Sequence, residues 1–189
     1  MAKSSSTHQA DTRCSLFLYP AISQPIDNSQ LQQIQDGLQK IALTGQALTD
    51  SKRHFYTGKK FLDYIAYMGC SPVISFEAGD KNNHFCHIRL LHYPQAKLIH
   101  SRLQARAPIC PQCKKPVKDW QENYGRIQCN YCGATSSTAD FNWRKMAGAS
   151  TLFIQITDIF PKEAIPQQVL LEKLAAIYPA NWRYFYSCR

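Results

Sequence analysis

The sequence predicts an α+β fold, a two-layer sandwich for which a ferredoxin-like topology is the favoured arrangement. Three observations support this class. Apolar residues make up 44% of the chain, which is enough to build one core. Segments typical of a strand and of a helix follow one another in both the first and the last third of the chain. Between them, residues 107–136 hold four cysteines in two close pairs, which indicates a small insertion.

The first third begins with a polar, Ser-rich stretch, residues 1–13, which we expect to be a disordered tail. The short apolar run at 14–19 predicts a buried strand. A helix should follow, with Asn28 or Ser29 as its N-cap and Gly45 near its end. Its apolar side chains recur at steps of three and four and therefore share one face: Leu31, Ile34, Leu38 and Ile41.

The middle of the main domain predicts a second helix and an antiparallel meander. Thr57 is a suitable cap for the helix, and Gly69 a suitable end. The apolar stripe of this helix would be Phe61, Leu62, Ile65 and Met68. Three strands should follow it, over residues 73–76, 84–93 and 97–103.

The last third predicts a β-α-β unit with parallel strands. The strands are expected at 151–160 and 182–186, and Pro166 fits the first turn of the helix between them. The predicted organisation is therefore an α+β domain formed by residues 14–106 and 137–189, with residues 107–136 inserted.

The charge and the termini restrict the class of protein. Lys and Arg number 22 against 13 Asp and Glu, a formal net charge of +9, which favours a polyanionic partner. No run approaches the roughly 18 apolar residues of a membrane helix, and the N-terminus lacks the apolar middle of a signal peptide. We therefore expect a soluble, cytoplasmic protein, with no membrane partner and with reduced thiols.

The cysteine-rich segment has the spacing of a metal site. It contains Cys110-Pro-Gln-Cys113 and, after fifteen residues, Cys129-Asn-Tyr-Cys132-Gly133. A gap of two residues lets one tight turn direct both thiolates at a single point. Two such turns supply four sulfur ligands at about 2.3 Å from a zinc ion. The sequence therefore predicts that Cys110, Cys113, Cys129 and Cys132 bind one metal ion.

The pattern C-P-x-C followed by C-x-x-C-G resembles the zinc-ribbon superfamily over about residues 107–136. Lys114 departs from the commonest form of the motif, in which glycine is frequent at that position. The resemblance implies a structural Zn²⁺, because a closed site of four thiolates has no open position for catalysis. Iron, bound as in rubredoxin-like redox proteins, is the alternative, since four thiolates suit both metals.

A second metal site is a further hypothesis. Cys70, His84 and Cys86 carry ligand side chains, and His84 and Cys86 would share one face of a strand. The alternative is that Cys70 and Cys86 are small buried apolar residues, and the lack of a closely spaced cysteine pair favours it. We assign no catalytic residue and expect a binding protein more than an enzyme.

Basic and aromatic side chains are interleaved around the insertion. Between Lys97 and Lys145, nine basic and three acidic residues give a net charge of +6. Basic groups bind phosphates and aromatic rings stack on unpaired bases. The candidate contacts are Lys114, Lys115, Lys118, Arg126, Trp120 and Tyr124. The alternative is that the aromatic residues pack a hairpin between the cysteine pairs and the lysines keep it soluble.

These observations predict a binding protein that contacts nucleic acid or an acidic protein partner through the cysteine-rich segment. A second hypothesis is an assembly or maturation adaptor that docks on a protein complex. The third is an iron redox protein or an enzyme.

Overall fold

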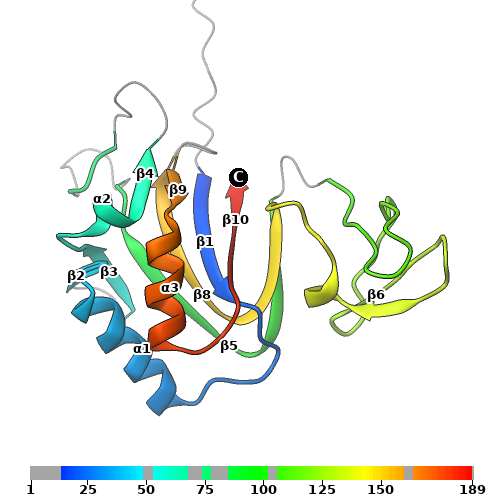
Figure 1. Cartoon of the computed structure of the whole chain (residues 1–189), viewed down its shortest axis with the longest axis horizontal. Coiled ribbons are helices and arrows are strands. Elements are labelled where there is room, and N and C mark those ends of the chain that lie inside the picture. The colour runs from blue at the N-terminus through cyan, green and yellow to red at the C-terminus, as the bar shows by residue number, and fades with distance from the viewer. Residues whose placement is uncertain are drawn as a thin grey trace, which may run out of the picture.

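The fold is built on one six-stranded sheet. The computed structural model describes residues 14–48, 53–67, 74–77, 85–101, 106–159 and 164–188. The strand order is β10-β1-β8-β5-β3-β2, and every neighbouring pair is antiparallel (Figure 1). The six strands are β1 (Cys14–Pro20), β2 (Thr44–Ala47), β3 (His54–Thr57), β5 (Ile88–His100), β8 (Ala147–Ile159) and β10 (Trp182–Cys188). With two main helices beside this sheet, the predicted α+β class is confirmed.

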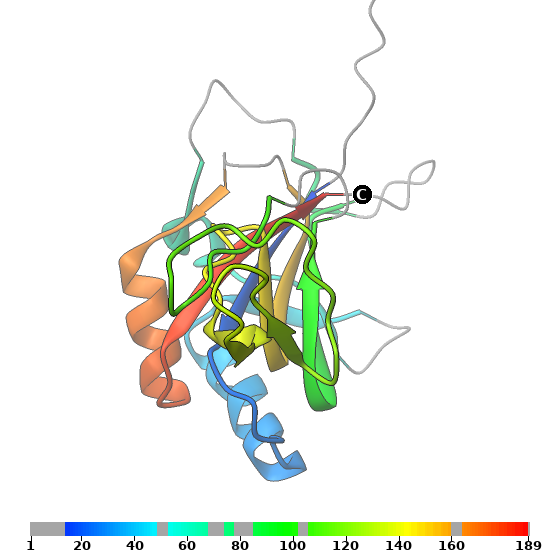
Figure 2. The ribbon, with the colours of Figure 1, turned by 90° about the vertical axis from the view of Figure 1, so that its right-hand side faces the viewer.

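The helices α1 (Asn28–Lys40) and α3 (Gln168–Ile177) pack against the sheet (Figure 2). Three of the four residues predicted for the apolar stripe of the first helix are buried, Leu31, Ile34 and Leu38, whereas Ile41 is the C-cap. The helix ends before the predicted Gly45, which lies in β2. The N-cap is one residue earlier than expected. Asp27 accepts a hydrogen bond from the backbone N–H of Gln30 at 2.8 Å, and the Gln30 side chain accepts one from the N–H of Asp27 at 3.1 Å. This reciprocal pair fixes the start of the helix.

The β-α-β unit predicted for the last third of the chain is present, with another strand between its two parallel strands. Strands β8 and β10 both run antiparallel to β1, so they are parallel to each other with β1 between them. Leaving the shorter strands aside, the order along the chain is β1, α1, β5, β8, α3, β10. The narrower ferredoxin-like assignment stays a prediction.

The helix predicted to start after Thr57 is wrong. Only one turn, α2 (Phe61–Tyr64), is helical, and the chain then extends into β4 (Ile65–Tyr67). Strand β4 pairs with β9 (Ala164–Pro166), which satisfies its backbone with hydrogen bonds that a helix would have formed internally. Met68, the last residue predicted for the apolar stripe of this helix, lies outside the described residues. The strand predicted at 73–76 is not found in the described residues 74–77.

The two strands expected at 84–93 and 97–103 are one long strand, β5. Its pairing with β8 shifts register between His92 and Lys97 and then continues to the pair His100 and Ala147. The cysteine-rich segment connects these two strand ends, so its base lies across two hydrogen-bonded strands. Figure 1 shows the segment extending from that end of the sheet, away from the helices.

A disulfide joins the first and last strands of the sheet. Cys14 and Cys188 lie directly opposite each other in the ladder between β1 and β10, and their sulfurs are bonded. The sequence predicted reduced thiols and indicated no partner for either residue. Disulfides are typical of oxidising compartments, so this bond does not support the cytoplasmic expectation. Within the described part of the chain, every helix is too short or too polar to cross a membrane.

Candidate metal centre

The four cysteines predicted as ligands converge on one point. All four Sγ atoms lie within 4.8 Å of one another. Cys110 Sγ is 3.9 Å from Cys132 Sγ, and Cys113 Sγ is 3.7 Å from Cys129 Sγ. A regular tetrahedron of sulfurs at about 2.3 Å from a zinc ion has edges of about 3.8 Å. The four thiols could therefore hold a metal ion with little rearrangement.

Two similar turns carry the cysteines. In the first, the N–H of Lys114 donates to the carbonyl of Cys110 at 3.1 Å; in the second, the N–H of Gly133 donates to that of Cys129 at 2.9 Å. The residue after the second cysteine is left-handed in both turns, with φ of 61° at Lys114 and 72° at Gly133. Glycine adopts this conformation freely and lysine does so at a cost. The left-handed φ explains why glycine is frequent in the motif at the position that Lys114 occupies here.

The thiols differ in acidity because backbone groups surround them unequally. Burial acts to raise the pKa of Cys129, but the N–H groups of Tyr131 and Cys132 offset it and lower that pKa to about 7. The N–H of Lys115 acts to lower the pKa of Cys113, yet burial and the three neighbouring sulfurs raise it to about 11. Four thiolates cannot be held together without a cation, and a bound metal supplies that charge.

A small apolar cluster supports the centre from the side of the sheet. It contains two of the ligands and five other buried residues: Cys110, Cys129, Val117, Ile127, Phe141, Trp143 and Ala147. The Trp143 indole N–H donates to the carbonyl of Thr138 at 2.7 Å. The two-stranded sheet of β6 (Arg126–Gln128) and β7 (Thr135–Ser137), with the short 3₁₀ helix η1 (Thr138–Asp140), completes the segment. With so few apolar side chains, the segment depends on its metal site and its base for stability.

The donor set limits the chemistry. Four thiolates around one ion leave no position for a metal-bound water, so the centre fits a structural role. Soft sulfur ligands suit zinc and iron alike, and the geometry does not identify the metal. Among the described residues, this is the one group of three or more Cys, His, Asp or Glu side chains that could hold a metal ion.

The hypothetical second site is only partly within the described residues. Cys70 and His84 lie outside them, so their relation to Cys86 stays a prediction. Cys86 belongs to the main core, and its burial raises the pKa of the thiol to about 12. The neighbouring His87 points its Nδ1 at the Thr157 hydroxyl, 2.9 Å away, while its Nε2 accepts from Arg89 Nε at 2.9 Å. The state of Cys86 fits the alternative of a small buried residue.

The six predicted contact residues occupy different environments. Lys114, Lys115, Lys118 and Arg126 are exposed. Lys114 Nζ also donates to the Pro111 carbonyl at 2.7 Å, and Lys115 Nζ lies 5.2 Å from the centre of the Tyr131 ring.

The two aromatic residues of this set, Trp120 and Tyr124, differ strongly in their exposure to solvent. Trp120 is half-buried, with its ring centre 5.0 Å from that of Trp143 in an edge-to-face arrangement. Tyr124 is 98% exposed, the highest value among the large apolar side chains described. It begins a tight turn in which Tyr124 and Gly125 have φ of 49° and 73°, and Asn123 and Arg126 are bonded through their backbones at 2.9 Å.

The sequence placed Trp143, Arg144 and Lys145 among the basic and aromatic residues around the insertion, but it predicted neither a role for Phe141 nor a base formed by these residues. Phe141 and Trp143 are buried beside the ligands, and Arg144 and Lys145 form a turn against β10. The signal was present in the run Phe141-Asn-Trp143-Arg-Lys145, which alternates aromatic and polar residues before β8.

Comparison of the chain with protein-family models, with curated proteins and with solved structures found no match.

Proposed function

We propose that residues 107–136 form a zinc ribbon whose metal is structural and whose exposed turn binds single-stranded nucleic acid. The four convergent thiols support the metal part of the proposal. The resemblance to the zinc-ribbon motif favours zinc, and iron stays the alternative, since four thiolates suit both metals.

The exposure of Tyr124 is the observation that carries the binding part. A tyrosine that is 98% exposed buries almost none of its apolar ring in the isolated protein. It also stands at a left-handed position that glycine or asparagine would fill at lower cost. A partner that stacks on the ring would account for both features.

Charge favours nucleic acid as that partner. Arg126 follows Tyr124 by two residues and is exposed, as are Lys114, Lys115 and Lys118. A cationic surface that carries an exposed ring matches the two groups of an unpaired nucleotide, the phosphate and the base. Trp120 packs against Trp143, so we assign it to the support of the turn and leave stacking to Tyr124.

The test is the binding of a fluorescein-labelled single-stranded oligonucleotide, followed by anisotropy across a salt series. Tyr124→Ala should weaken binding about tenfold, since stacking on one base contributes roughly 1–3 kcal/mol. Tyr124→Phe keeps the ring and should bind as the unchanged protein does. Lys118→Gln should lower both the affinity and the salt dependence. Lys59→Gln, an equal charge change at an exposed position outside the ribbon, should alter neither.

Two outcomes would contradict the proposal. The first is no binding at low salt, where electrostatic attraction is strongest. The second is binding that Tyr124→Ala and Lys118→Gln leave unchanged. A nuclease-resistant, stoichiometric protein partner on purification would instead favour an adaptor, and a red protein would favour iron.

A further inference from the structure

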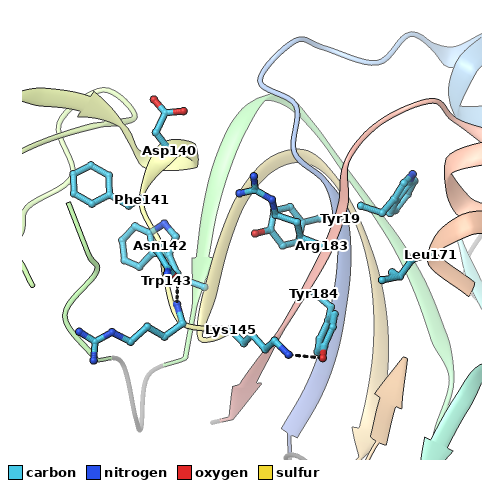
Figure 3. A pocket seen from close by; sticks show the side chains of 12 residues that line it. Tyr19, Asp140, Phe141, Asn142, Trp143, Lys145, Leu171, Arg183 and Tyr184 are labelled. Carbon is cyan, nitrogen blue, oxygen red and sulfur yellow. Dashed lines mark hydrogen bonds between the residues drawn. The ribbon is translucent and has the colours of Figure 1, made fainter. Parts of the chain in front are cut away.

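A pocket of about 540 Å³ lies where the base of the ribbon meets the edge strand β10. This volume is within the range of small-molecule sites. Figure 3 shows Phe141, Trp143 and Lys145 on the ribbon side, and Tyr19, Arg183 and Tyr184 on the side of the sheet. These residues come from three distant parts of the chain, so only the folded protein forms the pocket.

One part of the pocket lining is aromatic and apolar. Trp143 and Trp182 are almost fully buried, and Tyr184 and Leu171 are half-buried. Both indole N–H groups are used internally: that of Trp143 donates to Thr138 O, and that of Trp182 donates to Tyr178 O at 3.1 Å. The two tryptophans therefore present carbon atoms to the pocket through the 6% of each residue's surface that is exposed. Flat aromatic walls favour a planar ligand.

The other part of the lining is cationic. Arg144, Lys145 and Arg183 line the pocket and are exposed, and Asp140 is the one acidic residue that lines it. Lys145 Nζ donates to the Tyr184 hydroxyl at 2.6 Å, and Arg183 lies close enough to the Tyr19 hydroxyl for its charge to act on the pKa of that group. The bond to Tyr184 holds Lys145 beside the aromatic wall, and both cations keep donors for a ligand, since ammonium has three and guanidinium five.

The turn that carries two of the cations is held in a costly conformation. Arg144 and Lys145 are both left-handed, with φ of 52° and 59°, and the N–H of Met146 donates to the Trp143 carbonyl at 3.0 Å. Turns of this kind favour Asn-Gly, whereas this one has Arg-Lys. The Lys145 carbonyl accepts a hydrogen bond from the N–H of Tyr186 at 3.1 Å, which fixes the turn to β10. Such strain is typical of functional positions.

From this arrangement we infer that the pocket binds a nucleotide, with the base against the aromatic wall and the phosphate at Lys145 and Arg183. The required ligand is planar at one end and anionic at the other. Both a free nucleoside monophosphate and a nucleotide within a single strand have this chemistry. The inference uses residues distinct from the exposed turn of the ribbon and does not depend on what that turn binds.

The experiment titrates the full-length protein with AMP, adenosine, inorganic phosphate and a trinucleotide by isothermal calorimetry. AMP or the trinucleotide should bind, and adenosine and phosphate should each bind at least about tenfold more weakly, since each lacks one of the two groups. Tighter binding of AMP assigns the site to free nucleotides, and tighter binding of the trinucleotide assigns it to a strand. Arg183→Gln and Lys145→Gln should each weaken binding about tenfold, because hydrogen bonds to charged groups are strong.

Two controls locate the binding. Lys173→Gln makes the same charge change at an exposed position of α3 that does not line the pocket, and it should leave affinity unchanged. The chain has three tryptophans, so the indole N–H signals can be followed by NMR, and AMP should shift that of Trp182 more than that of Trp120. Failure of AMP and the trinucleotide to bind would overturn the inference. So would affinity that is equal for adenosine and AMP, or that Arg183→Gln and Lys145→Gln do not change.

Discussion

Removal of the Cys14–Cys188 disulfide should destabilise the sheet measurably. The two cysteines are 174 residues apart in the sequence, so the bond closes nearly the whole described chain into one loop. In the chain-entropy account, a loop of this length restricts the unfolded state by about 5 kcal/mol. The ladder of β1 and β10 already places the two residues opposite each other, so the folded state should change little on reduction.

The assay is urea unfolding followed by circular dichroism, without and with a phosphine reductant. Reduction should lower the free energy of unfolding by about 3–5 kcal/mol. It should also raise the slope against urea, because the reduced unfolded chain exposes more surface. The double variant Cys14→Ser/Cys188→Ser should behave as the reduced protein does and should no longer respond to reductant. Because these residues are not among the four metal ligands, metal content should stay the same.

Two results would refute this reasoning. One is an unfolding midpoint that neither reductant nor the double variant changes. The other is alkylation of Cys14 in the native protein without reductant, detected by peptide mass spectrometry, because a bonded sulfur cannot react.

Three further predictions address packing, backbone and pH. Gly148→Ala would place a Cβ 2.6 Å from the Tyr19 ring and 2.8 Å from that of Phe185, so it should cost about 1–3 kcal/mol in urea unfolding; an unchanged midpoint would contradict the packing. Lys114→Gly removes a left-handed lysine and should raise the thermal stability of the metal-bound protein by up to about 1 kcal/mol, whereas a lower melting temperature would show that the side chain supports the turn. Burial lowers the pKa of His87, so the unfolded chain binds a proton more readily there, and the free energy of unfolding should fall as the pH is lowered through the ordinary histidine pKa of about 6.5. His87→Gln should reduce the pH dependence of the free energy of unfolding. If the variant showed the same pH dependence as the unchanged protein, another group would be its cause.

The first helix and the four sulfurs could be predicted from sequence because both depend on local spacing. Steps of three and four place Leu31, Ile34 and Leu38 on one face whatever surrounds them. Likewise, a gap of two residues shapes each cysteine turn by itself, and only the approach of the two turns depends on the rest of the fold.

The errors arose where long-range pairing decides the structure. Ile65 lies in a helical pattern with Phe61, yet it pairs as a strand with Pro166, about a hundred residues later. The Cys14–Cys188 bond depends on two chain ends meeting in adjacent strands, which no local pattern indicates. Trp120, a candidate contact residue, is half-buried and packs on Trp143, a partner supplied only by the fold, and its contact role stays a prediction.

The pocket beside β10 could not be predicted from the sequence for the same reason. Tyr19, Lys145 and Arg183 are far apart in the sequence, and their meeting depends on the order of the sheet. The exposed tyrosine, by contrast, had a sequence signal, because Gly125 directly after Tyr124 is typical of a tight turn.

The central claim is that four thiolates bind one zinc ion and that this ion shapes the ribbon. The most direct measurement is the metal content of the native protein, by native mass spectrometry with X-ray absorption at the metal edge. The account predicts one zinc ion per chain, surrounded by four sulfurs at about 2.3 Å. A chain that carries no metal, and whose Cys110 and Cys129 are alkylated independently of each other, would contradict it.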